Sequence, residues 1–194
     1  SGDWSSDVCS SDLNLANAAK VSAGGIFRDS GQVCVAGSRL LVQRSIYEPF
    51  LEALKAEAEG MVVGDPLDLR TTAGAIASET QCRSILTKID RARSEGARLL
   101  TGGERILSET GGTYIAPTIF AEVDPRSDLA QEEVFGPVVG VTPFDDEAEA
   151  IALANSTVYG LAAGVWTDNL SRAHRMVRAL KAGVVHVKIG RAHV

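Results

Sequence analysis

The chain has 194 residues, of which 45% are hydrophobic and 23% charged, and its formal net charge is −6. These values are typical of one soluble globular domain or of one lobe of a larger protein. The acidic balance, without a basic cluster, argues against nucleic-acid binding. No apolar run approaches the ~20 residues that span a bilayer and no secretory signal is visible, so we expect a cytoplasmic protein without membrane partners.

Residues 1–12 are rich in Ser and Asp and show no helical or strand period, which predicts a disordered tail. Residues 13–187 alternate between helical and strand patterns, which predicts βαβ units. In chain order the predicted elements are a helix over 13–28, a strand over 39–43, a helix over 45–60 capped by Ser45, a helix over 78–95, a strand over 97–100, an extended stretch over 115–123, a strand over 138–144, a helix from 145 or 146 to 155, a strand over 161–167, a helix over 168–182 and a strand over 184–187. This order predicts an α/β three-layer sandwich, with a mostly parallel sheet covered by helices on both faces.

Cys34 lies in the segment GQVCVAGSR, between a predicted helix and a predicted strand. Free cysteines most often pack as small buried hydrophobes, so a structural role is one interpretation. The glycines on both sides favour a second, in which the thiol is a nucleophile at a sharp bend. Its neighbours Val33 and Val35 would place it in a fairly dry pocket. Because an ordinary cysteine has a pKa of about 8.5, the site would also need a base or a positive field.

The other two cysteines, Cys9 and Cys82, lie far from Cys34 and from each other. Their number and spacing fit neither a disulfide framework nor a zinc site. No pair of histidines has ligand spacing either, so we expect no metal site.

A second motif is the segment QEEVFGP, residues 131–137, just before a predicted strand. One interpretation is a solvated acidic turn. The other is a ligand-binding loop, in which a carboxylate accepts hydrogen bonds from ligand hydroxyls while Phe135 packs against a flat ring.

Taken together, the two motifs resemble the cysteine signature and the cofactor-contacting loop of the aldehyde dehydrogenase superfamily, in the same order and about 99 residues apart. Shorter segments also resemble that family, including Gly64-Asp65-Pro66-Leu67 and Val165-Trp166-Thr167. The resemblance covers residues 13–187. The stretch Ser171–Met176 is most similar to the branch that oxidises γ-glutamylaminobutyraldehyde and related amino-aldehydes.

The resemblance implies the catalytic domain of an enzyme that oxidises a small-molecule aldehyde to a carboxylic acid with NAD or NADP. It implies that Cys34 attacks the aldehyde and passes through a thiohemiacetal and a thioester. It implies that Glu133 holds the nicotinamide ribose, that Phe135 borders the nicotinamide, and that Gln81 contacts a cofactor ribose, although a helix-cap role for Gln81 fits equally well. Full-length members of the family are expected to form homo-oligomers.

The departures from the family pattern indicate a fragment. The family's general-base Glu, its Asn oxyanion donor and its cofactor domain would all precede residue 1, and no glycine-rich phosphate loop is present. Residues 1–12 and 188–194 do not follow the family pattern and resemble translated sequencing-adapter sequence. Asp3 and Asp7, the acids nearest the missing base, are poor replacements for it. Two alternatives to the enzyme therefore stay open: a truncated fragment without catalysis, and a cofactor-independent cysteine esterase.

Overall fold

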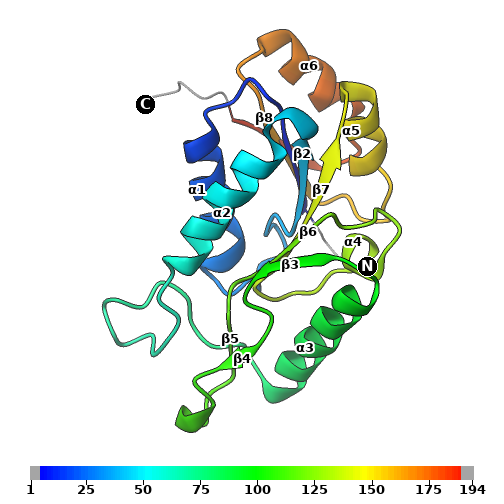
Figure 1. Ribbon diagram of the computed structural model, residues 1–194. Helices are drawn as coiled ribbons and strands as arrows, with labels where there is room; N and C mark the ends of the chain where they lie inside the picture. The colour runs from blue at the N-terminus through cyan, green and yellow to red at the C-terminus, as the bar shows by residue number, and fades with distance from the viewer. Residues whose placement is uncertain (1–4, 189–194) are drawn as a thin grey trace.

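The computed structural model describes residues 5–188, which form a sheet flanked by helices (Figure 1). Seven strands in this range pair in the order β3-β6-β7-β2-β1-β8-β9. Every neighbouring pair is parallel except β3 and β6. Their bounds are β1 Ser5–Cys9, β2 Arg39–Gln43, β3 Arg98–Thr101, β6 Thr118–Ala121, β7 Val138–Phe144, β8 Ala162–Trp166 and β9 Val184–Lys188. A separate antiparallel pair, β4 Arg105–Ile106 and β5 Tyr114–Ile115, lies outside this sheet.

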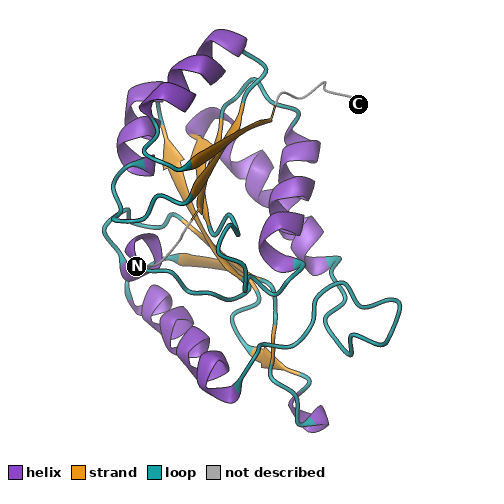
Figure 2. Cartoon of the chain, turned by 180° about the vertical axis from the view of Figure 1, so that it is seen from behind, coloured by secondary structure: helices purple, strands orange, loops and turns teal. Residues whose placement is uncertain are grey.

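Helices cover both faces of the sheet, as the alternating pattern predicts (Figures 1 and 2). Their bounds are α1 Leu15–Phe27, α2 Tyr47–Glu59, α3 Glu79–Ser94, α4 Asp128–Gln131, α5 Glu147–Ala154 and α6 Leu170–Ala179. Successive strand residues point to opposite faces. Thus Leu40 and Val42 pack with α1 and α2, whereas Leu41 packs with α5 and α6. Phe120 packs with α3 and α4. The prediction of a three-layer sandwich is confirmed.

The prediction of a disordered tail over 1–12 is wrong for residues 5–12. Residues 5–9 form β1 in the middle of the sheet, in parallel register with β2 on one side and β8 on the other. Val8 and Cys9 are 2% and 0% exposed and enter the cores on opposite faces. Strand formation depends on long-range partners more than on local propensity, so Ser and Asp content misled the prediction. Residues 1–4 lie outside the described range.

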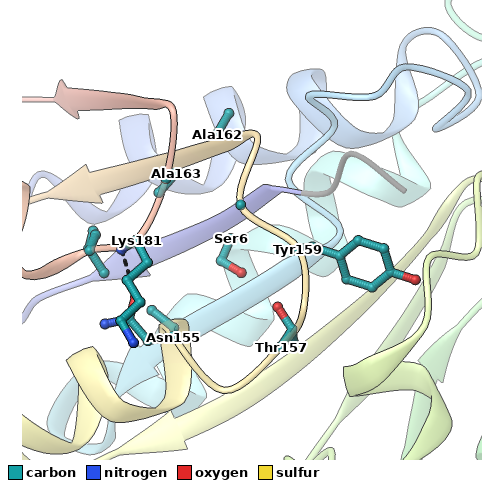
Figure 3. A pocket seen from close by; sticks show the side chains of 11 residues that line it. Ser6, Asn155, Thr157, Tyr159, Ala162, Ala163 and Lys181 are labelled. Carbon is teal, nitrogen blue, oxygen red and sulfur yellow. Dashed lines mark hydrogen bonds between the residues drawn. The ribbon is translucent and has the colours of Figure 1, made fainter. Parts of the chain in front are cut away.

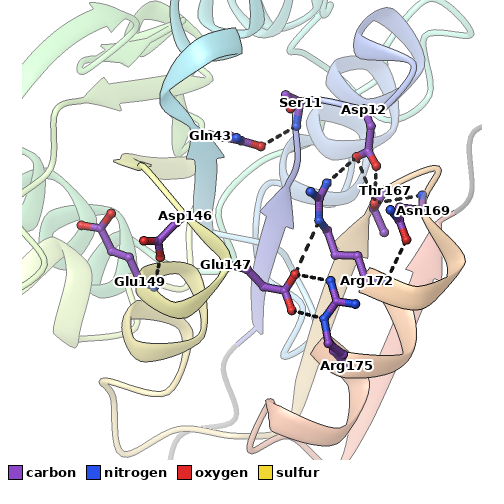
Figure 4. Close-up of polar contacts among 10 residues, drawn as sticks. All are labelled: Ser11, Asp12, Gln43, Asp146, Glu147, Glu149, Thr167, Asn169, Arg172 and Arg175. Atoms are coloured by element: carbon purple, nitrogen blue, oxygen red, sulfur yellow. Dashed lines mark hydrogen bonds and ion pairs between the residues drawn. The ribbon is translucent and has the colours of Figure 1, made fainter.

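Polar contacts also hold the chain that leaves β1 (Figure 4). The Ser11 N–H donates to Gln43 Oε1 at 2.8 Å. The Asp12 carboxylate accepts from the Thr167 hydroxyl at 2.9 Å and pairs with Arg172 at 3.1 Å. Arg172 also forms an ion pair with Glu147. These contacts tie residues 11–12 to β2, to the end of β8 and to α6, so the segment is part of the folded domain.

Smaller differences from prediction concern the ends of elements. The helix predicted from Ser45 begins at Tyr47, after a 3₁₀ turn over 44–46, and no side chain caps it. The helix predicted from residue 168 begins at Leu170, because Asn169 is its cap and accepts from Arg172 N. Ser78 caps α3 at the predicted start of that helix, and Asp146, one of the two predicted starting residues, caps α5. Residue 188, placed in a C-terminal tail by the sequence pattern, ends β9, and residues 189–194 lie outside the described range. No helix in residues 5–188 is long and apolar enough to cross a membrane.

Tyr47 links α2 to the sheet through a buried hydroxyl. It donates to the Val141 carbonyl at 3.0 Å and accepts from the Glu122 N–H at 2.7 Å. The side chain is 6% exposed, and burial raises the pKa of Tyr47 to about 12. An unfolded chain would instead ionise this group at a pKa of about 10.

We predict that Tyr47→Phe lowers the free energy of unfolding by about 1–2 kcal/mol, because the Glu122 N–H loses its acceptor and the Val141 carbonyl keeps only its bond from the Val123 N–H. Between pH 10 and 12 the unfolded state releases the Tyr47 proton first, so this group makes the folded wild type less stable as pH rises. The Tyr47→Phe variant should lack the part of this stability loss that comes from Tyr47. Urea unfolding at several pH values measures both effects, with Tyr114→Phe as the control because its hydroxyl has no hydrogen-bond partner among residues 5–188. Equal pH dependence in wild type and Tyr47→Phe would contradict the prediction.

Candidate active site

Cys34 occupies a tight turn between α1 and β2. The Ala36 N–H donates to the Val33 carbonyl at 2.9 Å, which makes Cys34 and Val35 the two central residues of a β-turn. The turn comes just before the N-terminal end of β2, and the side chains of both central residues are exposed. Within residues 5–188, the Cys34 N–H donates to no hydrogen-bond acceptor. The turn therefore presents a thiol and a backbone donor together.

The expectation of a dry pocket around the thiol is wrong for the described residues. Cys34 is exposed and Val35 is 50% exposed, because no described residue covers the outer side of the turn. Apolar neighbours in sequence can bury a side chain only where another element packs over them. The two other thiols behave in the opposite way, since Cys9 and Cys82 are each 0% exposed. Burial raises the pKa of both, that of Cys9 strongly, which keeps them protonated and inert.

The segment before the turn is packed against the loop that follows α4. Gly31 has a φ of +65°, and a Cβ at this position would overlap the carbonyl of Gly136. A Cβ at Gly136 would in turn come within 2.5 Å of Ile85 Cδ1. Glycine at position 31 therefore lets the two backbones touch, and glycine at position 136 lets the loop pack against Ile85 of α3. This contact brings the two sequence motifs side by side.

Phe135 is held in a strained conformation within this second loop. Its φ is +52°, a left-handed value that L side chains other than Asn and Asp rarely adopt. Gln81, in the first turn of α3, donates through Nε2 to the Phe135 carbonyl at 3.0 Å and to the Val134 carbonyl at 3.2 Å. The ring is 39% exposed. Gln81 thus fixes the loop backbone, while Ser78, not Gln81, supplies the side-chain cap of α3.

The acidic pair beside Phe135 has two different environments. Lys88 Nζ donates to Glu132 Oε2 at 2.9 Å, and this hydrogen bond lowers the pKa of Glu132. The same ammonium donates to the backbone carbonyl of Glu133 at 3.1 Å. Glu133 itself is half-buried. Lys88 therefore pairs with the Glu132 carboxylate and fixes the backbone at Glu133.

Two positioning residues were not identified from sequence. Gln32 donates from Nε2 to the Ala75 carbonyl at 3.3 Å and accepts from the Ala77 N–H at 2.8 Å. The Ser30 hydroxyl donates to the Gly74 carbonyl at 2.7 Å. Both attach the segment over 74–77 to the chain just before Cys34. Gln32 belongs to the GQVC motif, so its place two residues before the thiol was the available signal.

Among residues 5–188, no carboxylate or imidazole is hydrogen-bonded to Cys34. Asp7 lies in β1, where its carboxylate packs against the backbones of Gly37 and Gly164. A cavity of about 150 Å³ beside it is also lined by Ser22 and His186. Within the same described range, no group of three His, Cys, Asp or Glu side chains is arranged to hold a metal ion.

A smaller cavity, of about 20 Å³, lies between the ends of α5 and α6 (Figure 3). There Asn155 donates to the Ala179 carbonyl at 2.9 Å and accepts from the Lys181 N–H at 2.8 Å. None of the lining residues belongs to the Cys34 turn or to the loop over 132–137. Asn155 therefore joins the ends of the two helices.

Comparison with known proteins identifies the family of the chain. The sequence model described as "Aldehyde dehydrogenase family" matches residues 5–193, which includes most of the two end segments that the sequence pattern set apart. Betaine aldehyde dehydrogenase 1 of Rhizobium meliloti is 47% identical over 177 residues, which are 91% of this chain and 36% of that protein. The betaine aldehyde dehydrogenase of Sinorhizobium fredii is 46% identical over the same shares. The chain thus spans little more than a third of these relatives.

Solved structures show the same fold. The gamma-glutamyl-gamma-aminobutyraldehyde dehydrogenase from Burkholderia cenocepacia superposes with a TM-score of 0.92 at 45% identity, covering 98% of this chain and 38% of that one. The indole-3-acetaldehyde dehydrogenase of P. syringae, solved with NAD⁺, superposes with a TM-score of 0.94 at 47% identity, covering 96% and 38%. The family match over 5–193, together with these superpositions, establishes that the chain belongs to the aldehyde dehydrogenase family.

Proposed function

We propose that this chain is the nucleophile-bearing part of an NAD- or NADP-dependent aldehyde dehydrogenase, with Cys34 as its catalytic residue. The observation that carries the proposal is the contact of Gly31 with Gly136, which joins an exposed thiol to a loop with an exposed aromatic ring. A nucleophile beside a flat apolar surface suits attack on an aldehyde that is stacked near a nicotinamide ring.

The Cys34 thiolate attacks the aldehyde carbon, and the carbonyl π electrons move to oxygen to give a hemithioacetal oxyanion. The Cys34 N–H, which has no acceptor among residues 5–188, donates to that oxygen. A bound NAD⁺ or NADP⁺ supplies the hydride acceptor. Loss of the hydride leaves a thioester on Cys34. Water then attacks the thioester carbon, and the carboxylic acid and the Cys34 thiolate are released as a base takes up the proton.

The residues near the thiol fit a nicotinamide nucleoside. Phe135, which is 39% exposed, offers an apolar face for the nicotinamide. The half-buried Glu133 carboxylate accepts hydrogen bonds from ribose hydroxyls. Gln81, whose amide is bonded to the loop carbonyls, acts as a positioning residue and not as a cofactor ligand. Support for NAD comes from the NAD⁺ bound in the P. syringae relative.

The step that the described residues do not serve is thioester hydrolysis. No carboxylate or imidazole in the described range bonds to Cys34, so we assign the general base to a group outside it. The whole enzyme, which we propose acts on an amino-aldehyde of the carboxylate-bearing γ-glutamylaminobutyraldehyde type in the cytoplasm as a homo-oligomer, would supply that base and a cofactor domain.

We predict that the 194-residue chain accepts one acyl group and then stops. p-Nitrophenyl acetate should release about one equivalent of p-nitrophenolate per chain, because attack at Cys34 needs only the thiolate whereas deacylation needs a base. The Cys34→Ala variant should show no burst, and Cys82→Ala should match wild type. Stopped-flow absorbance and intact mass measure the burst and the acetyl adduct. Continuous turnover would favour the cysteine-esterase alternative, whereas the absence of any acyl adduct would contradict the nucleophile assignment.

We further predict that the backbone strain at Phe135 can be measured as stability. Phe135→Gly should unfold with a free energy about 1 kcal/mol larger than that of Phe135→Ala, because glycine adopts a φ of +52° without a Cβ clash. At the exposed Val158, whose φ is not positive, the order should reverse. Urea unfolding of the four variants gives both differences. An alanine variant at Phe135 as stable as the glycine variant would show that the loop is unstrained.

A further inference from the structure

A groove of about 470 Å³ runs along α1 and ends at the Cys34 turn. Lys20, Gly24 and Arg28 lie four residues apart, so they form one row on the exposed face of this helix. The turn contributes Val33 and Val35. An extended molecule attached at the thiol can therefore lie along the helix.

Two glycines make the floor of this groove. Gly24 and Gly25 lie inside a helix, where glycine is less favourable than alanine. Neither has a positive φ. A Cβ at Gly25 would meet no atom within 4 Å, and one at Gly24 would meet only Arg28 Nη2, at 3.9 Å. Neither the backbone conformation nor packing requires glycine here. The effect of the two glycines is therefore to leave open space where other residues would have side chains.

Positively charged groups outnumber negatively charged ones along the groove. Its lining includes two cations, Lys20 and Arg28, and one anion, Asp29. Among residues 5–188, neither cation forms an ion pair. The contact distance at Gly24 places the Arg28 guanidinium back along the helix over the glycine floor. Val21 and Val35, which also line the groove, are 38% and 50% exposed. The groove thus combines exposed apolar side chains with a net positive charge, and it reaches the two neighbours of Cys34, Val33 and Val35.

We infer that the α1 groove selects aldehydes that carry a carboxylate at the end remote from the aldehyde, with a methylene chain between them. Arg28 and Lys20 bind the carboxylate, while the exposed valines contact the methylenes. Betaine aldehyde, after which the relatives from Sinorhizobium fredii and Rhizobium meliloti are named, carries a trimethylammonium group and would meet two like charges instead. This inference rests on the proposed function, since it presumes that the substrate reacts at Cys34.

The test uses three thiol reagents that differ in charge: neutral N-ethylmaleimide, anionic 4-maleimidobutyrate and a maleimide bearing a trimethylammonium group. Rates of adduct formation at Cys34 are followed by intact mass and peptide mapping in the full chain. The ratio of the anionic to the neutral rate constant should fall about 2- to 5-fold in the Lys20→Gln/Arg28→Gln double variant. The ratio of the cationic to the neutral rate constant should rise, and high salt should reduce both changes.

The matched control is Arg83→Gln/Arg178→Gln, which removes the same charge from α3 and α6 on the other face of the sheet and should leave both ratios unchanged. Circular dichroism confirms that each variant is folded. If Cys34 reacts but the ratios do not depend on Lys20 and Arg28, the substrate inference is overturned and the nucleophile assignment stands. If Cys34 reacts with none of the reagents, the proposed function fails and the inference fails with it.

Discussion

The site depends on one contact, the approach of the Gly31 backbone to the Gly136 carbonyl. The two segments are more than a hundred residues apart in sequence, and each belongs to a different part of the sheet. The first leads from α1 into β2, and the second leads from α4 into β7. Since β2 and β7 are parallel neighbours, both segments reach the same edge of the sheet. Only residues without a Cβ then allow them to touch, which sets where the thiol and the Phe135 ring lie.

Side-chain hydrogen bonds from neighbouring segments hold the two loops in place around this contact. Gln81 and Lys88 reach from α3 to the carbonyls of the second loop, while Gln32 fixes the first segment to residues 75 and 77. The strained φ of Phe135 is sustained because its carbonyl is bonded on one side and the next residue is packed against Ile85. Neither loop has much secondary structure of its own. The side-chain hydrogen bonds therefore take the place of the backbone hydrogen bonds that a strand would form with its neighbours.

The sequence predicted the sandwich and the helices that begin at Ser78 and at residue 145 or 146, because these depend on local pattern. Both motifs were visible in the sequence, and the structure brings their glycines, Gly31 and Gly136, into contact. It failed at β1, where Ser6 and Asp7 look like a solvated segment. The strand forms because β2 and β8 offer hydrogen bonds on both sides, and no local pattern contains that information. The exposure of Cys34 was also missed. Val33 and Val35 suggested burial, but burial depends on which elements pack over the turn.

The packing contact itself can be tested most directly with two alanine substitutions. Gly31 and Gly111 both have a positive φ, +65° and +76°, but a Cβ at Gly111 meets no atom within 4 Å. Gly111→Ala should therefore cost only the backbone penalty, about 1 kcal/mol in free energy of unfolding. Gly31→Ala should cost at least about 2 kcal/mol more, because a backbone overlap is added, and hydrogen exchange should become faster at residues 134–137. Equal costs for the two variants, with unchanged exchange in that loop, would contradict the account.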